Sequence, residues 1–200
     1  LMDIDGNYYN WIGIGKQAWM VENLKTKHYS NGTTIQLIEI ATSWHTMTIS
    51  DKAYCYYDNS STNADAYGAL YTWAAAMNGA TSSNANPSGV QGACPDGWHV
   101  PSDVEWTELF DYLGGTNIAG GKMKETGNTH WIIPNTGATN ESGFTGLPSG
   151  NRENDGDFRF LNSRAYFWSA TEQGSSYAGY SQLSYDHSDV GLGALTKTYG

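Results

Sequence analysis

The chain has 200 residues, of which 24 are glycine, 14% are aromatic and only 15% are charged, and its formal net charge is −10. Such an acidic chain is repelled by phosphate backbones and by anionic lipid, which argues against nucleic acid and charged membrane surfaces as partners. No apolar run approaches the roughly 18 residues that a membrane span needs, so we expect no direct membrane insertion of this stretch. One loop-rich domain covering residues 1–200 fits this length and composition best.

The first part of the chain is predicted to form short antiparallel strands. Asp5-Gly6 is a hairpin-turn signal between residues 2–4 and residues 8–12. An aromatic run at residues 53–57, bounded by a polar loop, predicts a core strand.

Two helices are predicted. The first covers about residues 66–77 and ends at Asn78-Gly79. The second begins after Ser102, which stands three residues before Glu105 in the capping-box pattern. Its apolar face consists of Trp106, Leu109, Phe110 and Leu113. Residues 114–165 carry turn signals without helical periodicity, so we expect long ordered loops there, and loops of this length often carry function.

A hairpin is predicted near the C-terminus. Residues 166–170 and 177–183 are strand-like and flank a turn at 172–176. The run from 173 to 199 mixes Tyr, Ser, Asp, Gly, Gln and His, the residue types that antibody-like surfaces use for rigid contact area beside adaptable hydrogen bonds. An ordinary polar hairpin has a similar composition, so both interpretations stay open.

The sequence holds no pattern typical of a catalytic or zinc site. The five histidines are scattered, and neither zinc-ligand spacing nor a nucleophile or nucleotide-binding motif occurs. Cys94 and His99 lie five residues apart across a turn without a third orienting group, which disfavours a nucleophile–base pair. We therefore expect no enzymatic activity. Cys55 and Cys94 form one disulfide or remain two free thiols, and the spacing does not decide between these alternatives.

One polar loop is a candidate metal site. Glu153, Asp155 and Asp157 carry carboxylate oxygens, the ligands that calcium prefers. The alternative is a solvated turn built on Asp155-Gly156. Apart from this possible calcium ion, we expect no cofactor.

Six segments resemble one bacterial family in matching order. They are WMVENL at residues 19–24, YGALYTW at 67–73, CPDGWHVPSDVEW at 94–106, GATNESGF at 137–144, LPSG at 147–150 and WSATE at 168–172. On these motifs the chain is similar to the Fibrobacter succinogenes major paralogous domain family. That family resembles in turn the formylglycine-generating-enzyme-like domains of the C-type lectin fold. The resemblance implies a C-type-lectin-like α+β domain with two helices, small and mostly antiparallel sheets and long ordered loops.

The sequence departs from these relatives at two points. Formylglycine-generating enzymes act through cysteines late in the chain, and this sequence has none after Cys94, so the resemblance does not carry their activity over. The resembling family usually has a third cysteine in a closing strand written about GFSVRC. We expect that strand to be absent from this stretch or supplied elsewhere, which leaves Cys94 free if the third cysteine is its usual partner.

The family also looks like the variable proteins of diversity-generating retroelements. In those systems mutagenesis converts asparagine codons mainly to Tyr, Ser, Asp, His or Gly codons. The residues of this kind near the C-terminus are Tyr177, Gly179, Ser181, Gln182, Ser184, Asp186, His187 and Asp189. The resemblance implies that they form a variable binding face.

We therefore predict non-catalytic ligand recognition by an adhesin-like module, extracellular or at a bacterial cell surface. Tyr180 and Tyr185 complete the binding face, and Arg152 and Trp168 flank it, unless Trp168 belongs to the core. The partner is an extracellular glycan or protein, and composition does not separate the two. The alternatives are a polysaccharide-binding module for plant-wall or other glycans, a cysteine- or metal-dependent enzyme related to formylglycine-generating enzymes, and a purely structural surface module.

Overall fold

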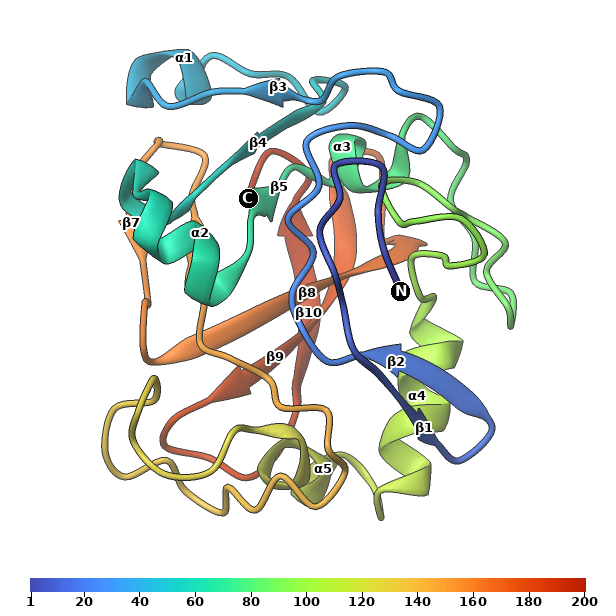
Figure 1. The fold of residues 1–200 in the computed structure, drawn as a ribbon, viewed down its shortest axis with the longest axis vertical. Helices are drawn as coiled ribbons and strands as arrows, with labels where there is room; N and C mark the ends of the chain where they lie inside the picture. Colours follow the sequence, from blue (N-terminus) through green and yellow to red (C-terminus); the bar gives the residue numbers. More distant parts are fainter.

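The computed structural model describes all residues from 1 to 200. Its strands are β1 (Trp11–Ile14), β2 (Gln17–Met20), β3 (Gln36–Leu37), β4 (Ala53–Cys55), β5 (Leu70–Tyr71), β6 (Asn151–Arg152), β7 (Phe158–Arg159), β8 (Arg164–Glu172), β9 (Tyr177–Ser184) and β10 (Gly191–Thr196). Its helices are α1 (Ala41–His45), α2 (Ser61–Tyr67), α3 (Trp73–Met77), α4 (Asp103–Tyr112) and α5 (Thr116–Met123), with a short 3-10 helix, η1 (Tyr57–Asn59). Figure 1 shows the helices arranged around the central strands β8, β9 and β10. This mixture confirms the α+β class.

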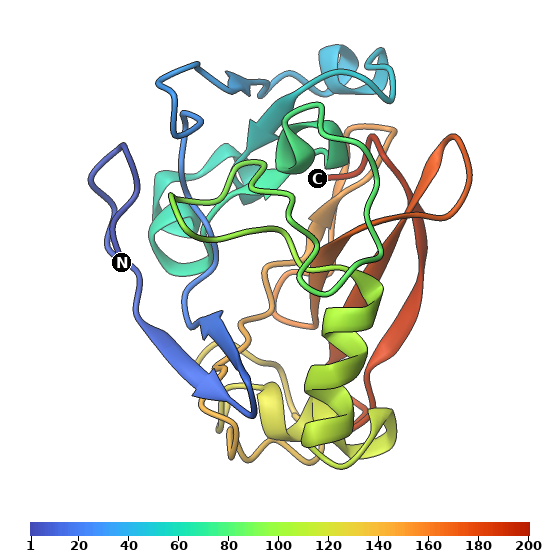
Figure 2. The same cartoon turned by 90° about the vertical axis from the view of Figure 1, so that its right-hand side faces the viewer.

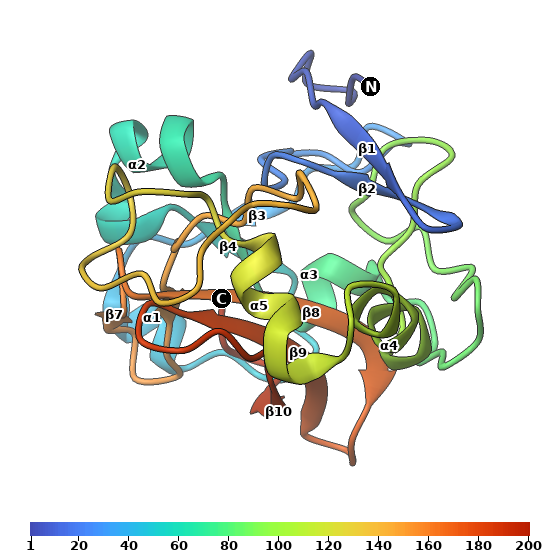
Figure 3. The same cartoon turned by 90° about the horizontal axis from the view of Figure 1, so that it is seen from below.

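The main sheet is antiparallel, with the order β10-β9-β8, so β8 is an edge strand. Side chains alternate between the two faces of a strand, which places Phe167 on one face and Tyr166 and Trp168 on the other. Helices α4 and α5 cover the Phe167 face, where the rings of Phe167 and Trp106 have centroids 5.7 Å apart (Figure 3). The predicted C-terminal hairpin is confirmed by the pairing of β8 with β9.

Helix α4 begins where the capping-box pattern predicts. The Ser102 hydroxyl accepts a hydrogen bond from the Glu105 N–H at 3.2 Å, and the Glu105 carboxylate accepts one from the Ser102 N–H at 3.0 Å. These two bonds satisfy donors that the first turn of a helix leaves free. The buried face of the helix contains Trp106, Leu109 and Phe110. These three side chains belong to the largest hydrophobic cluster, so they anchor α4 in the core.

The prediction of only two helices is wrong, because the structure has five α-helices. The region 66–77 is broken into α2, β5 and α3. Gly68, with φ of 75°, ends α2, and the Thr72 side chain then accepts from the Ala75 N–H to cap α3. Between α2 and α3, the two residues of β5 pair with β4, so strand pairing interrupts the helical pattern.

Helix α5 lies inside the region predicted to be loops. Its Gly120 and Gly121 look like helix breakers, but both serve close approach of other chain segments. A Cβ atom would lie 2.3 Å from the Asp189 carbonyl oxygen at position 120 and 2.4 Å from the Gly137 carbonyl oxygen at position 121. Tertiary packing therefore outweighs the low helix propensity of glycine here.

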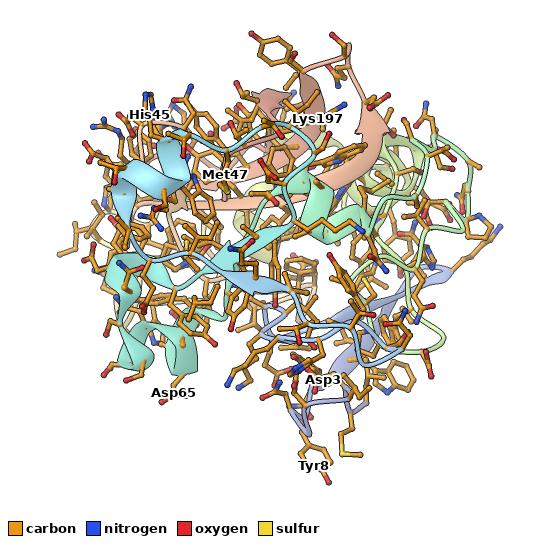
Figure 4. All side chains as sticks on the ribbon, turned by 90° about the horizontal axis from the view of Figure 1, so that it is seen from above. Asp3, Tyr8, His45, Met47, Asp65 and Lys197 are labelled. Carbon is orange, nitrogen blue, oxygen red and sulfur yellow. The ribbon has the colours of Figure 1, made fainter.

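The N-terminal arm is held by two aspartates rather than by a regular hairpin. Met2 and Tyr8 form a single bridge, and continuous pairing begins only at β1 and β2. Asp3 accepts a bond from the Tyr9 hydroxyl at 2.7 Å, and Asp5 accepts one from the Lys27 N–H at 2.6 Å. Figure 4 shows Asp3 at the base of this arm and Tyr8 projecting from its surface.

The remaining two sheets are small. β3 pairs in parallel with β4, β4 pairs antiparallel with β5, and β6 pairs antiparallel with β7. The predicted strand 53–57 is confirmed for β4 and then turns into η1. Gly200 exchanges two main-chain hydrogen bonds with Arg152, of 2.8 and 2.9 Å, which ties residue 200 to β6.

Candidate functional site

A cleft of about 700 Å³ opens beside the edge of β8. Its walls are β2 and the segment after it, β5, the loop around residues 94–101, the first turn of α4 and the free edge of β8. Figure 2 shows the ribbon of three of these elements, namely the β1–β2 hairpin, the loop before α4 and the main sheet. The volume lies within the range of ligand-binding clefts.

The walls of the cleft are strongly aromatic. Ten aromatic residues line it: Trp19, Tyr71, Trp98, Trp106, Phe144, Tyr166, Phe167, Trp168, Tyr180 and Tyr199. The charged side chains are few, namely Lys16, Glu22, Glu105 and His99, a titratable residue. Such a lining favours an uncharged ligand with flat or apolar groups.

The ladder between β8 and β9 shows which main-chain groups face the cleft. The Tyr185 N–H donates to the Ser163 carbonyl at 3.0 Å, so this opposed pair is hydrogen-bonded. In an antiparallel ladder such pairs recur at every second residue. The main-chain groups of Tyr166 and Trp168 therefore point away from β9, into the cleft. The only hydrogen bond on that side is a long one of 3.4 Å, from Trp106 Nε1 to the Trp168 carbonyl.

Two further strand edges face the same space. β5 is the last strand of its sheet, and Trp168 Nε1 reaches across to donate to the Tyr71 carbonyl at 2.8 Å. β2 pairs only with β1, so its other edge, at Ala18 and Met20, lines the cleft as well. The cleft thus lies between strands that each have one unpaired edge.

His99 and Glu105 form a hydrogen-bonded pair in the wall. His99 Nε2 lies 2.6 Å from Glu105 Oε1, while the other carboxylate oxygen accepts main-chain N–H groups of Ser88, at 3.1 Å, and Ser102, at 3.0 Å. His99 is half-buried and takes part in a hydrogen bond. These contacts tie the carboxylate to two loops and to the start of α4, so the pair holds the cleft wall together.

The two cysteines are free thiols, which answers the question that the sequence left open. Burial raises the pKa of the Cys94 thiol to about 12. Burial likewise raises the pKa of Cys55 to about 12, although the nearby Arg152 opposes the shift. A nucleophilic cysteine needs a lowered pKa, and the surroundings of both thiols act in the opposite direction.

Arg152 was predicted to flank a ligand, and this is wrong because its side chain is 1% exposed. Its guanidinium donates to the carbonyls of Ile38 at 2.7 Å, Glu39 at 2.8 Å and Gly156 at 3.0 Å. It also lies 4.6 Å from the centroids of the Trp44 and Phe158 rings. Arg152 therefore joins the segment around α1 to β6 and β7.

The remaining predicted ligand-binding residues do not form one surface. Trp168 and Tyr180 line the cleft. Gly179, Ser181 and Ser184 are buried, so the structure contradicts the prediction that these three contact a ligand. A Cβ atom at position 179 would lie 2.6 Å from Asp103 Oδ1. The close approach of α4 thus requires glycine there and prevents free variation at that position.

The other members of that set lie outside the cleft. Gln182 is half-buried beside β10, and Tyr185 packs against the largest hydrophobic cluster. Asp186 and His187 are exposed and form an ion pair of 2.7 Å. The exposed residues Tyr177 and Asp189 lie at the first residue of β9 and in the segment between β9 and β10, respectively. The predicted C-terminal binding face is therefore split into an interior part, a cleft part and a solvent part.

The predicted calcium loop is organised by an arginine. Arg159 makes ion pairs with Glu153 at 2.9 Å, Asp155 at 2.9 Å and Asp157 at 3.5 Å. Backbone and Arg159 hydrogen bonds hold the pKa of Asp155 below its usual value. No group of three or more His, Cys, Asp or Glu side chains is arranged to hold a metal ion. Arg159 thus pairs with all three carboxylates of this loop, and calcium binding there stays a prediction.

Sequence reasoning missed most of the aromatic residues of the cleft. Trp19, Trp98 and Trp106 lie in the family motifs, but their role there was interpreted as structural. The alternation of Tyr166, Phe167 and Trp168 was a usable signal, because three successive large aromatic residues on one strand leave apolar rings on both faces.

The fold and the cleft define a loop-rich α+β domain with an open, aromatic cleft. A family profile, described as the Fibrobacter succinogenes major domain, matches residues 12–191. The chain belongs to this family. No curated protein and no solved structure matches it, so the relation to C-type lectins stays a prediction. The longest helix, α4, has 10 residues, and none of the helices has the length and apolar character to cross a membrane.

Proposed function

We propose that the domain recognises a ligand without chemical conversion, at a bacterial cell surface, and that the ligand lies in the aromatic cleft. The observation that carries this proposal is the cleft of about 700 Å³ and its ten aromatic lining residues. An open, largely apolar space with a few placed polar groups is the usual form of a binding site. The extracellular setting rests on the low content of charged residues, 15%, together with 24 glycines.

The polar groups of the cleft support binding rather than catalysis. A catalytic acid or base must be able to reach a reacting atom, whereas Glu105 is occupied by His99 and by two main-chain N–H groups. The thiol of Cys94, with its pKa raised by burial to about 12, is protonated at neutral pH. These features disfavour the alternative of a cysteine-dependent enzyme.

Two tryptophan substitutions, one inside the cleft and one outside it, test the location of the site. Trp98 lines the cleft and is partly exposed, whereas Trp11 is 59% exposed on β1 and does not line it. We screen the protein against an array of plant-wall oligosaccharides, including cellohexaose and xylohexaose, and against an array of short peptides. For any probe that binds, we expect Trp98→Ala to weaken binding at least tenfold, which corresponds to about 1.4 kcal/mol, and Trp11→Ala to have a much smaller effect.

Two results would refute the proposal. Equal losses in the two variants would place the ligand elsewhere on the surface. Absence of binding to every probe on both arrays, with circular dichroism showing a folded protein, would remove the support for a recognition function.

A further inference from the structure

We propose that Asn31 is a site of spontaneous chemical modification, where the main-chain nitrogen of Gly32 attacks the Asn31 side chain and converts it, through a cyclic imide, into aspartate and isoaspartate. The reactants are the chain itself and water. The site is a surface turn that does not line the cleft, so this inference is independent of the proposed function.

The chemistry selects asparagine residues that precede glycine. Ring closure requires the nitrogen of the following residue to approach the side-chain carbonyl carbon, Cγ, and a side chain on that residue hinders the approach. Glycine has no Cβ atom and adopts a wide range of backbone conformations. The sequence has two such pairs, Asn31-Gly32 and Asn78-Gly79, and the fold holds them in different ways.

The reaction balances without an oxidant or a reductant. Hydroxide removes the proton of the Gly32 N–H, the nitrogen forms a bond to Asn31 Cγ, and the bond from Cγ to Nδ2 breaks as ammonia leaves with a proton from water. Water then opens the imide. Attack at Cγ gives aspartate, whereas attack at the main-chain carbonyl gives isoaspartate, in which the backbone runs through the former side chain. In sum, one water is consumed and one ammonia is released.

The Asn31 side chain is exposed, and its two amide atoms are bonded differently. Its Oδ1 accepts a hydrogen bond from the Thr33 N–H at 2.9 Å, whereas its Nδ2 has no hydrogen-bond partner in the chain. Negative charge develops on Oδ1 when the nitrogen attacks, and a donor that already points at this oxygen stabilises that charge. The turn therefore polarises the carbonyl and leaves the departing nitrogen free.

The main chain here forms the tip of a small hairpin. The tip is closed by a bond of 2.9 Å from the Tyr29 N–H to the Thr33 carbonyl, and by one of 2.8 Å from the Gly32 N–H to the Tyr29 carbonyl. Residues 31–34 are exposed, whereas Tyr29 and Ile35 are only 3% and 1% exposed. Exposed main-chain bonds with few packed neighbours open at low free energy. The Gly32 N–H is therefore freed for attack while the buried anchors on both sides stay in place.

Asn78 also precedes glycine, but the end of helix α3 holds it. It is the left-handed C-cap residue, with φ of 52° and ψ of 28°, and its N–H donates to the Ala75 carbonyl at 3.3 Å. The Lys52 ammonium donates to Asn78 Oδ1 at 2.9 Å, which polarises this carbonyl too, so the main chain makes the difference. Ring closure needs the Gly79 nitrogen eclipsed with the Asn78 Cβ, so ψ must leave its observed value. Four of the five residues of α3 are buried, so unwinding the helix end costs packing that the hairpin tip does not have.

Either product changes the surface of the tip. Both carry a new carboxylate, which adds one negative charge to the formal net charge of −10. Isoaspartate also adds one atom to the backbone, which disrupts the pairing across the tip. The Ser30 hydroxyl accepts a bond from Gln91 Nε2 at 3.0 Å, and the same nitrogen donates to Asp96 at 2.9 Å. Modification therefore loosens the contact between this tip and the loop before α4.

The test follows both sites in the whole folded chain. The protein is incubated at pH 8.5 and 37 °C in water enriched in oxygen-18, digested with trypsin and examined by tandem mass spectrometry, so that label in the new carboxyl group marks conversion during the incubation. Trypsin releases residues 28–52, in which Asn31 is the only asparagine. Protein isoaspartate methyltransferase measures isoaspartate separately. We expect Asn31 to convert at least tenfold faster than Asn78, with isoaspartate as the main product.

Two controls isolate the role of the fold. In guanidinium chloride both asparagines lie in an unfolded chain and both precede glycine, so we expect their rates to become similar. Asn31→Gln keeps the amide but lengthens the side chain by one methylene, which disfavours the ring. This variant should lose the signal at position 31, while circular dichroism shows an unchanged fold.

Two results would overturn the proposal. Equal rates at Asn31 and Asn78 in the folded protein would show that the fold does not select the site. Absence of isoaspartate at Asn31 in the folded protein, after the denatured protein has converted completely, would show that the tip stays closed. Neither result bears on ligand binding in the cleft.

Discussion

Replacing Arg152 by methionine separates a structural role from a ligand-binding role at this position. The change keeps an unbranched apolar side chain between the Trp44 and Phe158 rings, and removes three hydrogen bonds from the guanidinium to main-chain carbonyls. Hydrogen bonds to a charged group contribute about 1.5–3 kcal/mol each, and the two ring contacts add roughly 0.5–2 kcal/mol each. Such contributions are not additive, so we expect the free energy of unfolding to fall by about 4–6 kcal/mol, near the effect of breaking a buried ion pair.

This loss is large enough to measure easily. For a domain of this size, 1 kcal/mol corresponds to about 2–4 °C in Tm, so a loss of 4–6 kcal/mol should lower Tm by roughly 8–24 °C. Urea titration followed by tryptophan fluorescence gives the free energy directly, provided that the slope with denaturant stays constant.

Arg159 provides the matched control. Its guanidinium is 43% exposed and pairs with carboxylates of the 153–157 loop. Solvent screens such pairs, so Arg159→Met should shift Tm much less than Arg152→Met. Equal shifts in the two variants, or an Arg152→Met protein that unfolds at the wild-type urea concentration, would refute the structural role of Arg152.

Three further predictions follow from buried groups. Since burial raises the pKa of Cys55 and Cys94 to about 12, the folded protein should react with iodoacetamide at pH 8 far more slowly than the denatured protein; rapid alkylation of the folded chain would contradict this. Lys124 donates to three main-chain carbonyls, so Lys124→Met should destabilise the fold by about 3 kcal/mol or more. Burial lowers the pKa of Lys124 from 10.5 to about 8, so the folded state binds its proton more weakly than the unfolded state does. The difference in the free energy of unfolding between wild type and Lys124→Met should therefore widen from pH 8 to 10.5. A constant difference in urea titrations would argue against this. A Cβ atom at Gly92 would lie 1.9 Å from a main-chain oxygen, whereas one at Gly89 meets nothing within 4 Å, and both residues have positive φ. Gly92→Ala should therefore lower Tm much more than Gly89→Ala does. Similar Tm values for the two variants would contradict this prediction.

The parts of the fold that were predicted correctly are those with local signals. The capping box of Ser102 and Glu105 fixes the start of α4 within four residues of sequence. The pairing of β8 with β9 follows from two strand-like runs around one short turn. In both cases the interactions that form the element join residues near each other in the chain.

The parts that were missed depend on distant segments. The pattern from 66 to 77 is helical by itself, and only the pairing of Tyr71 with Tyr54 shows that a strand divides it. Helix α5 contains two adjacent glycines, and the reason for them is visible only when Asp189 and Gly137 approach. Residue propensity carries no information on such contacts.

The same reason explains the errors at the site. Arg152 stands in the most polar loop of the sequence, yet its partners Ile38 and Glu39 lie 114 and 113 residues away. The cleft is built from β2, β5, β8 and the loop before α4, four segments spread over the whole chain. A linear pattern indicated the aromatic residues individually, but their convergence requires the tertiary structure.

The recessed position of the β8 edge also bears on how copies of this domain behave when crowded together. An unpaired strand edge normally invites edge-to-edge association and aggregation. Here the open interval lies in the cleft, between β2 and β5, so the walls of the cleft hinder contact between this edge and the edge of a second folded copy. We therefore expect little edge-to-edge association through β8 even at high protein concentration.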